Sequence, residues 1–175
     1  LAVAEAAAKQ RELGFDVVEF SMGEPDFPTP ANIKKAAIRA IEADFSKYTP
    51  ADGIKELKEA VISKHARDLG SSYDISEVIV NVGGKHSIFS VFSALITHGD
   101  EVIIPTPYWV SFADITRYVG ANPIFVHTPE EDGFCLTAGM VEEAITPKTK
   151  LLIVNSPSNP SGAVLENDEF VRIAE

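Results

Sequence analysis

Gly83, Gly84 and Lys85 follow one another where an apolar segment gives way to a helix-like pattern. Adjacent glycines let the backbone approach a ligand closely, and free N–H groups at the start of a helix attract an anion. Phosphate is the natural anion for such a place, although a glycine turn that binds nothing explains these residues equally well. The spacing matches neither the Walker P-loop nor the dinucleotide-binding fingerprint.

Two further loops carry side chains that could contact a flat ring. The first, PTPYWVSF at residues 105–112, holds Trp109, the single tryptophan of the chain. Its ring could stack on a planar ligand, but a core anchor beneath the loop is the favoured interpretation for an isolated tryptophan. The second, NSPSNPSG at residues 155–162, holds Asn155 and Asn159, whose amides both donate and accept hydrogen bonds. Asn-Pro is also ordinary turn chemistry, so this loop alone is ambiguous.

The elements that must position these loops are strands and helices in alternation. Strands are predicted at residues 78–82, 101–104, 124–127 and 150–155, and helices at 86–97, 110–119, 138–145 and from 166 onward. This order predicts an α/β fold with a mainly parallel sheet and helices on both faces. Ligands of such sheets collect beyond the carboxyl ends of the strands, where all three loops are expected. Together the loops suit a flat, phosphorylated ring cofactor.

The remaining elements are predicted from periodicity and capping. Residues 1–13 read as a helix and residues 17–20 as a short strand. A further helix opens with Thr29 as its N-cap and Pro30 at its first position, and another ends near Gly70. The helix at residues 86–97 is apolar on nearly every side, which predicts that it is buried.

Composition excludes several classes of function. The chain has 175 residues, 45% of them hydrophobic, which is enough for one sizeable core. Its net charge of −11 opposes binding to nucleic acid, and no apolar run is long enough to span a membrane. Cys135 is the only cysteine, and no two histidines have the spacing of a paired metal site. We therefore expect no metal centre.

Five segments resemble the class I, pyridoxal-phosphate-dependent aminotransferases of fold type I, and most closely the bacterial aspartate aminotransferases. They follow one another in the order and at the spacing of that family, and the resemblance covers essentially the whole chain. Each segment alone is weakly specific, but five in register are strongly specific. The segments are GEPDFPTP at residues 23–30, KYTPADGIKELKEA at 47–60, VNVGGKHSIF at 80–89, GDEVIIPTPYWVSF at 99–112 and AITPKTKLLIVNSPSNPSGAV at 144–164.

The resemblance implies pyridoxal 5'-phosphate as the cofactor and gives residues of this chain roles in binding it. Backbone N–H groups of the Gly83, Gly84 and Lys85 stretch seat the phosphate in the family, which favours the anion over the plain turn. Trp109 matches the aromatic residue that stacks on the pyridine ring. Asn159 matches the amide that hydrogen-bonds the phenolic oxygen of that ring.

Substrates and a partner subunit are implied in the same way. Gly23 matches the residue whose backbone meets the substrate carboxylate, with Trp109 and Asn159 also beside the substrate. Lys85 matches a lysine near the distal carboxylate of acidic substrates, which points to aspartate or glutamate as amino donor and a 2-oxo acid as acceptor. Tyr48 matches the tyrosine that reaches the phosphate of the neighbouring subunit, so a homodimer is expected. The protein is also expected to be cytoplasmic.

One departure from the family is large. The Schiff-base lysine, the aspartate beside the pyridine nitrogen and two arginines all follow the last matched segment, so no catalytic residue is assigned here. Lys148 and Lys150 do not stand at the position of that lysine. We expect residues 1–30 to belong to the small domain and residues 31–175 to be the first, truncated part of the large domain. The chain alone is predicted to be inactive.

Other functions stay open at this point. The same fold serves lyases and other enzymes that use the same cofactor, and fold does not fix function. Transamination of prephenate, a second acidic substrate, is known in similar proteins. A non-catalytic sensing module built on an aminotransferase fold is a third alternative, although the sequence holds no basic helix-turn-helix segment that would support it.

Overall fold

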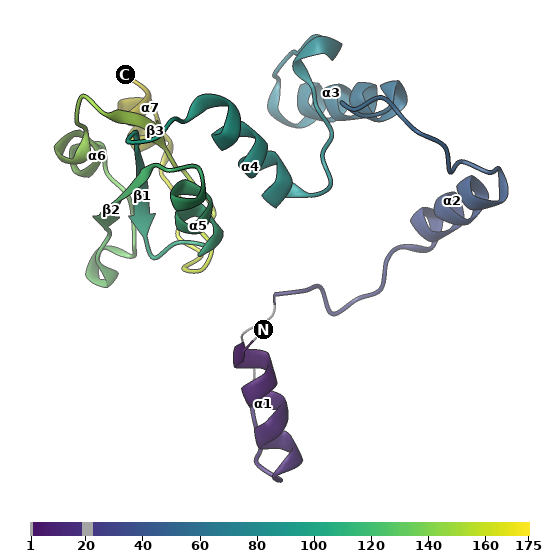
Figure 1. Cartoon of the computed structure of the whole chain (residues 1–175), viewed down its shortest axis with the longest axis horizontal. Helices are drawn as coiled ribbons and strands as arrows, with labels where there is room; N and C mark the ends of the chain where they lie inside the picture. Colours follow the sequence, from purple (N-terminus) through teal and green to yellow (C-terminus); the bar gives the residue numbers. More distant parts are fainter. Residues whose placement is uncertain (1, 19–22) are drawn as a thin grey trace. The chain divides into compact units, whose positions relative to one another are not determined.

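The structure, a computed structural model, describes residues 2–18 and 23–175. The chain divides into two compact units, Leu1–Thr49 and Pro50–Glu175. The first unit contains helices α1 (Ala2–Glu12) and α2 (Ala31–Glu42), and the second contains the sheet and the remaining helices (Figure 1). The predicted boundary between residues 30 and 31 refers to the domains of a complete enzyme and stays a prediction.

A three-stranded parallel sheet forms the centre of the second unit. Its strands are β1 (Glu101–Thr106), β2 (Asn122–His127) and β3 (Thr149–Leu152), in the order β2-β1-β3. The register places Ile103 opposite Ile124 on one side and opposite Leu152 on the other. The three apolar runs predicted as strands therefore do form the sheet, and the α/β fold with a parallel sheet is confirmed.

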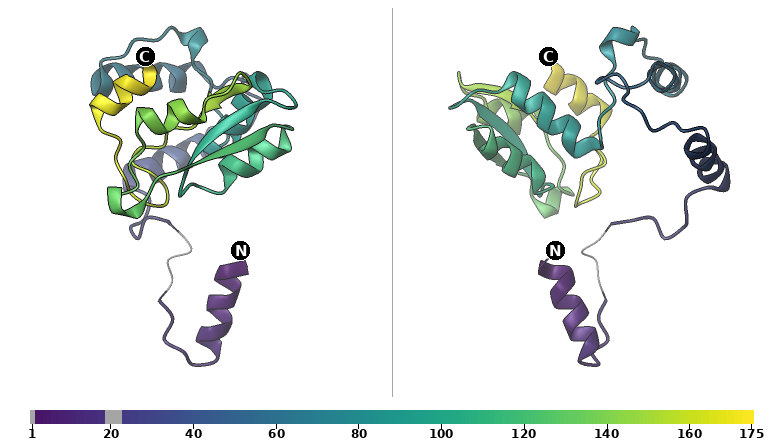
Figure 2. Two further views of the ribbon diagram at one scale, coloured as in Figure 1. Left: turned by 90° about the vertical axis from the view of Figure 1, so that its left-hand side faces the viewer. Right: turned by 45° about the vertical axis from the view of Figure 1, so that its right-hand side comes forward.

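Helices cover both faces of this sheet, which makes three layers (Figures 1 and 2). Side chains of β1 alternate between the faces, as a strand requires. Val102 and Ile104 pack with residues of α4 and α5, whereas Ile103 packs with residues of α6 and α7. All three of these β1 side chains are fully buried. Helices α4 (Gly84–Leu95), α5 (Ser111–Tyr118), α6 (Ala138–Ala144) and α7 (Asn167–Ala174) flank the sheet. The second unit also contains α3 (Lys55–Leu69), which contacts the 3₁₀ turn at Ile75–Glu77, and a second 3₁₀ turn at Glu130–Asp132.

The strand predicted at residues 78–82 is wrong. This segment is extended but lies in no sheet of the described chain, and Ile79 and Val82 are exposed. A strand needs a neighbour to accept and donate its ladder hydrogen bonds. Instead, the Val80 N–H donates to the carbonyl of Asp52, in a turn. Of the strand predicted at residues 17–20, Val17 and Val18 lie in no strand, and the other two residues lie outside the described ranges.

Two helix predictions also need correction. Helix α2 begins one residue later than predicted, with Pro30 rather than Thr29 at the N-cap. The predicted burial of the helix at residues 86–97 is largely wrong, because α4 buries Phe92 while Val91 and Leu95 are about half exposed. Only one side of α4 packs against the core that includes β1 and α5. Within the described ranges, the chain has no helix of the length and apolarity that crossing a membrane requires.

Candidate functional site

The start of helix α4 presents the diglycine turn in an open arrangement. Gly83 has a φ of +94°, a left-handed conformation that favours glycine, and no side chain caps the helix. A Cβ added at Gly83 or Gly84 would meet nothing within 4 Å, so the space in front of the turn is free. The first N–H groups of an α-helix have no carbonyl partner inside the helix. These donors are therefore available to an anion, and the positive end of the helix dipole favours one there.

Local hydrogen bonds hold this turn in its conformation. The N–H of Gly83 donates to the carbonyl of Asn81 at 2.8 Å, and the N–H of Ser87 donates to the carbonyl of Gly83 at 3.2 Å. The side-chain amide of Asn81 donates to the hydroxyl of Ser87 at 3.1 Å. The turn is thus fixed from both sides before any ligand binds.

Lys85 and Trp109 come together across two elements. The ammonium nitrogen of Lys85, on α4, lies over the Trp109 ring at 5.1 Å from its centroid. A lysine over an aromatic face is a favourable cation–π arrangement. The contact places a positive charge and an aromatic ring beside the open helix start, within a chain whose net charge is −11. A local positive charge there compensates the acidity of the chain where an anion would bind.

Trp109 also serves as a packing residue. Its ring meets Phe112 edge to face at 5.4 Å, with an interplanar angle of 90°, and it packs against the buried cluster of α4, β1 and α5. The side chain is half-buried rather than buried, so part of the ring stays accessible. The structure therefore shows the core-anchor role, while stacking on a planar ligand stays a prediction.

Asn159 is held by the loop that follows β3. Its backbone N–H donates to the Asn155 side-chain oxygen at 2.9 Å, and the Asn155 amide donates to the carbonyl of Pro157 at 3.3 Å. These two bonds give Asn155 a structural position within the loop. Further along, the Leu165 N–H donates to the Ser156 hydroxyl at 2.9 Å, which ties the loop back onto its own start.

A small, partly open hollow lies beyond the carboxyl ends of β1 and β3. Asn159 lines it together with Asn155, Tyr108 and the buried Thr128. Tyr108 stacks on Phe125 with ring centroids 5.2 Å apart. Of the predicted cofactor residues, only Asn159 lines this hollow. The structure therefore brings Lys85 and Trp109 into contact, and Asn159 lines the same hollow as Tyr108, the neighbour of Trp109 in sequence.

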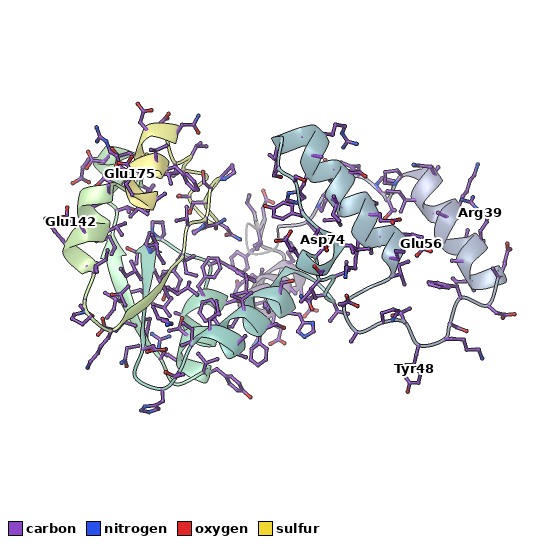
Figure 3. All side chains as sticks on the ribbon, turned by 90° about the horizontal axis from the view of Figure 1, so that it is seen from above. Arg39, Tyr48, Glu56, Asp74, Glu142 and Glu175 are labelled. Carbon is purple, nitrogen blue, oxygen red and sulfur yellow. The ribbon has the colours of Figure 1, made fainter. Side chains whose placement is uncertain are left out.

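Gly23 and Tyr48 lie in the first unit, and both are exposed. The Tyr48 side chain has a relative exposure of 107% and points away from the ribbon (Figure 3). Such full exposure leaves the phenol free for a ligand or another chain. The roles that the sequence gives to these two residues stay predictions.

Two residues that line the hollow, Tyr108 and Thr128, have no role assigned from the sequence. Tyr108 precedes Trp109 in the loop at residues 105–112. Thr128, whose hydroxyl donates to the carbonyl of Thr106 at 2.6 Å, carries no local signal.

The chemistry of this arrangement is binding and orientation. Backbone donors, an ammonium group, an aromatic ring and an amide can hold a flat anionic ligand, and pyridoxal phosphate carries the phosphate, the ring and the ring oxygen that these groups would bind. Lys148 and Lys150 stand at the amino end of β3, whereas the site loops follow the carboxyl ends of the strands. Neither lysine is therefore placed to react with a ligand held by those loops.

Comparison with known proteins gives a consistent result. The family described as class I and II aminotransferases matches residues 16–175. Over all 175 residues, the chain is 45% identical to an aspartate aminotransferase of Geobacillus stearothermophilus and 47% identical to a probable aspartate/prephenate aminotransferase of Rickettsia bellii. It covers 44% of each of these relatives, so it spans somewhat less than half their length.

Solved structures extend the comparison. Aspartate aminotransferase from Thermus thermophilus with maleate matches with a TM-score of 0.94 and 44% identity, over 99% of this chain and 45% of that chain. Alanine aminotransferase from Pyrococcus furiosus matches with a TM-score of 0.93 and 26% identity, over 98% of this chain and 44% of that chain.

Proposed function

Because this chain belongs to the family of class I and II aminotransferases, we propose that the complete protein transfers an amino group between an L-amino acid and a 2-oxo acid. Pyridoxal 5'-phosphate is the proposed cofactor. The observation that carries the proposal is the contact between Lys85 and Trp109 at the uncapped start of α4. This contact places the Trp109 ring beside the free N–H groups at the start of α4, which are the positions where the family binds a phosphorylated ring.

The residues of this chain would bind and orient the cofactor. In this proposal Gly83, Gly84 and Lys85 form the seat of the phosphate, to which the N–H groups of Gly84 and Lys85 donate, and the ammonium group of Lys85 adds positive charge. Trp109 packs against one face of the ring, and Asn159 donates to the ring oxygen. The cofactor itself supplies the electron sink that stabilises negative charge on the substrate carbon. A fixed turn and a proline-stiffened loop limit the entropy lost on binding.

Aspartate or glutamate is the proposed amino donor. Lys85 offers a positive charge for a second carboxylate, and relatives at 45–47% identity carry the names aspartate or aspartate/prephenate aminotransferase. The Thermus thermophilus structure is described with maleate, a dicarboxylate. The names of these relatives give no support to a lyase or to a non-catalytic sensing module. Gly23 is proposed to meet the carboxylate that all amino acids share.

A homodimer in the cytoplasm completes the proposal. Tyr48 is proposed to reach the phosphate bound by a second copy, and its full exposure supports an intermolecular role. Residues 1–30 are proposed to belong to the small domain of each subunit and residues 31–175 to the large domain. The chain described here would then supply part of each cofactor pocket and part of the interface.

A transamination assay tests this function. The complete protein with pyridoxal phosphate is expected to form glutamate from L-aspartate and 2-oxoglutarate, and to show the visible absorbance of a bound cofactor. The 175-residue chain alone is expected to transfer no amino groups, since the family's reactive lysine has no counterpart in it. Prephenate is assayed in parallel as an alternative acceptor. Absence of transfer by the complete protein with every one of these acceptors would refute the proposal, as would transfer by the chain alone.

A further inference from the structure

Lys58 is the only charged residue that is buried among those the structure describes, with 6% of its surface exposed. It lies on α3, away from any candidate site residue in sequence. Its ammonium group bonds to the carboxylate of Asp52, whose side chain is half exposed. The hydrogen bond from Lys58 is the main cause that holds the pKa of the Asp52 carboxyl below its ordinary value, so this carboxylate is ionised at neutral pH.

Stability alone does not account for such a pair. Taking an ammonium group out of water is costly, and an apolar side chain of similar volume often serves a folded protein as well or better. Buried pairs can instead fix one particular arrangement of the backbone. Lys58 can therefore act on the backbone segment that carries its partner, Asp52.

Asp52 belongs to a tight turn that lies directly against residue 80. The N–H of Gly53 donates to the carbonyl of Pro50 at 3.1 Å, which closes the turn, and the carbonyl of Asp52 accepts from the N–H of Val80 at 3.0 Å. Gly53 has a φ of +101°, and a Cβ added there would lie 2.8 Å from the Cβ of Val80. Only glycine permits this close approach, so the position of Asp52 determines the position of Val80.

Val80 leads directly into the diglycine turn. The next residue, Asn81, accepts a hydrogen bond from the N–H of Gly83 and donates one to the hydroxyl of Ser87. Segment 78–82 has no sheet neighbour within the described chain, so no ladder of hydrogen bonds fixes it. The bond from Val80 to Asp52 is therefore the backbone hydrogen bond that anchors the incoming arm of the turn to another element.

We propose that Lys58 is a positioning residue for phosphate binding: by pairing with Asp52 it fixes the turn at Pro50–Gly53, and through Val80 it sets the direction of the N–H groups at Gly84 and Lys85. This inference rests on the proposed function, because it requires a phosphorylated ligand at the start of α4. Lys58 does not touch that ligand. Its effect is confined to the phosphate group and does not extend to the ring.

Two forms of the cofactor isolate that effect. Pyridoxamine 5'-phosphate and pyridoxamine differ only in the phosphate, and neither forms a covalent bond with a lysine. Their dissociation constants are measured by calorimetry on the complete protein stripped of cofactor. Lys58→Met is expected to weaken binding of the phosphorylated form by about tenfold, or 1.4 kcal/mol, and to leave pyridoxamine binding unchanged. Lys58→Arg keeps a donor for Asp52 and is expected to restore phosphate-dependent binding.

The matched control is Lys64→Met on the same helix. Lys64 pairs with Asp68, but 66% of its side chain is exposed and it contacts no turn of the site. We expect this variant to bind both compounds as the unaltered protein does. The double variant Lys58→Met with Asp52→Ala removes both charges of the pair, so no carboxylate is left at the turn without its partner, and it serves as the folded variant if Lys58→Met alone does not fold. It is expected to show the same phosphate-specific loss.

The outcomes separate the two proposals. Equal weakening of both compounds in the Lys58 variants, or no weakening of either, would overturn the positioning role while leaving the proposed function intact. An unaltered protein that binds pyridoxamine 5'-phosphate no more tightly than pyridoxamine would overturn the phosphate seat itself, and with it this inference.

Discussion

Replacement of Gly84 by aspartate is expected to weaken binding of pyridoxal phosphate by about two orders of magnitude. Gly84 is the first residue of α4, and a Cβ added there meets nothing within 4 Å, so the new side chain fits. Its carboxylate would lie about 5 Å from the bound phosphate, where two unit negative charges repel by about 3 kcal/mol at an effective dielectric constant near 20. Calorimetric titration of the complete, cofactor-free protein measures this loss.

The same substitution should act on stability in the opposite direction. An acidic residue in the first turn of a helix is favourable by about 0.3–1 kcal/mol, and replacing glycine removes flexibility from the unfolded chain. We therefore expect the cofactor-free Gly84→Asp protein to unfold at the same urea concentration as the unaltered protein or at a higher one. Gly84→Asn has the same shape without the charge and serves as the control. An equal loss of affinity in both variants would mean that charge at this helix start is irrelevant.

Truncation of Trp109 to alanine is expected to lower both the stability and the affinity for cofactor. A buried aromatic side chain replaced by alanine typically costs about 3–5 kcal/mol, and half-burial reduces this to about 2 kcal/mol. Loss of stacking on the cofactor ring adds about 0.5–1.5 kcal/mol to the binding free energy. Urea unfolding with and without cofactor separates the two contributions.

Two other variants help to interpret that result. Trp109→Phe keeps an aromatic ring that can meet Phe112, so we expect most of the stability to remain. Tyr118→Ala removes an aromatic side chain that is 78% exposed, and it should change neither quantity by more than about 0.5 kcal/mol. A Trp109→Ala protein that lost stability but bound cofactor with unchanged affinity would leave the core-anchor role and exclude stacking.

The sheet was predictable because its signal is local. Each strand of the sheet is a short apolar run, and the helices between them carry a clear periodicity, so order and type follow from the sequence. The segment at residues 78–82 carries the same signal and yet forms no strand. A segment forms a strand only where another strand lies beside it, and the sequence of a short segment does not show whether such a neighbour exists. The same holds for helix α4. Its apolar residues indicate that it packs against other elements, but the sequence of the helix does not show which elements those are.

The site was predictable in its parts rather than in its assembly. The diglycine, the tryptophan and the asparagine each also allow a purely structural interpretation, and only their common register within a family favours the cofactor-binding one. The contact between Lys85 and Trp109 depends on the distance between two elements far apart in the sequence. The pairing of Lys58 with Asp52 depends likewise on a turn whose contact with Val80 becomes visible only in three dimensions.

A crystal structure of the complete protein with pyridoxal phosphate tests the central claim most directly. We expect phosphate oxygens at hydrogen-bond distance, about 2.7–3.2 Å, from the backbone nitrogens of Gly84 and Lys85. We also expect the Trp109 ring to lie against the pyridine ring and the Asn159 amide to lie beside its oxygen. A phosphate bound elsewhere, with the start of α4 open to solvent, would contradict the account.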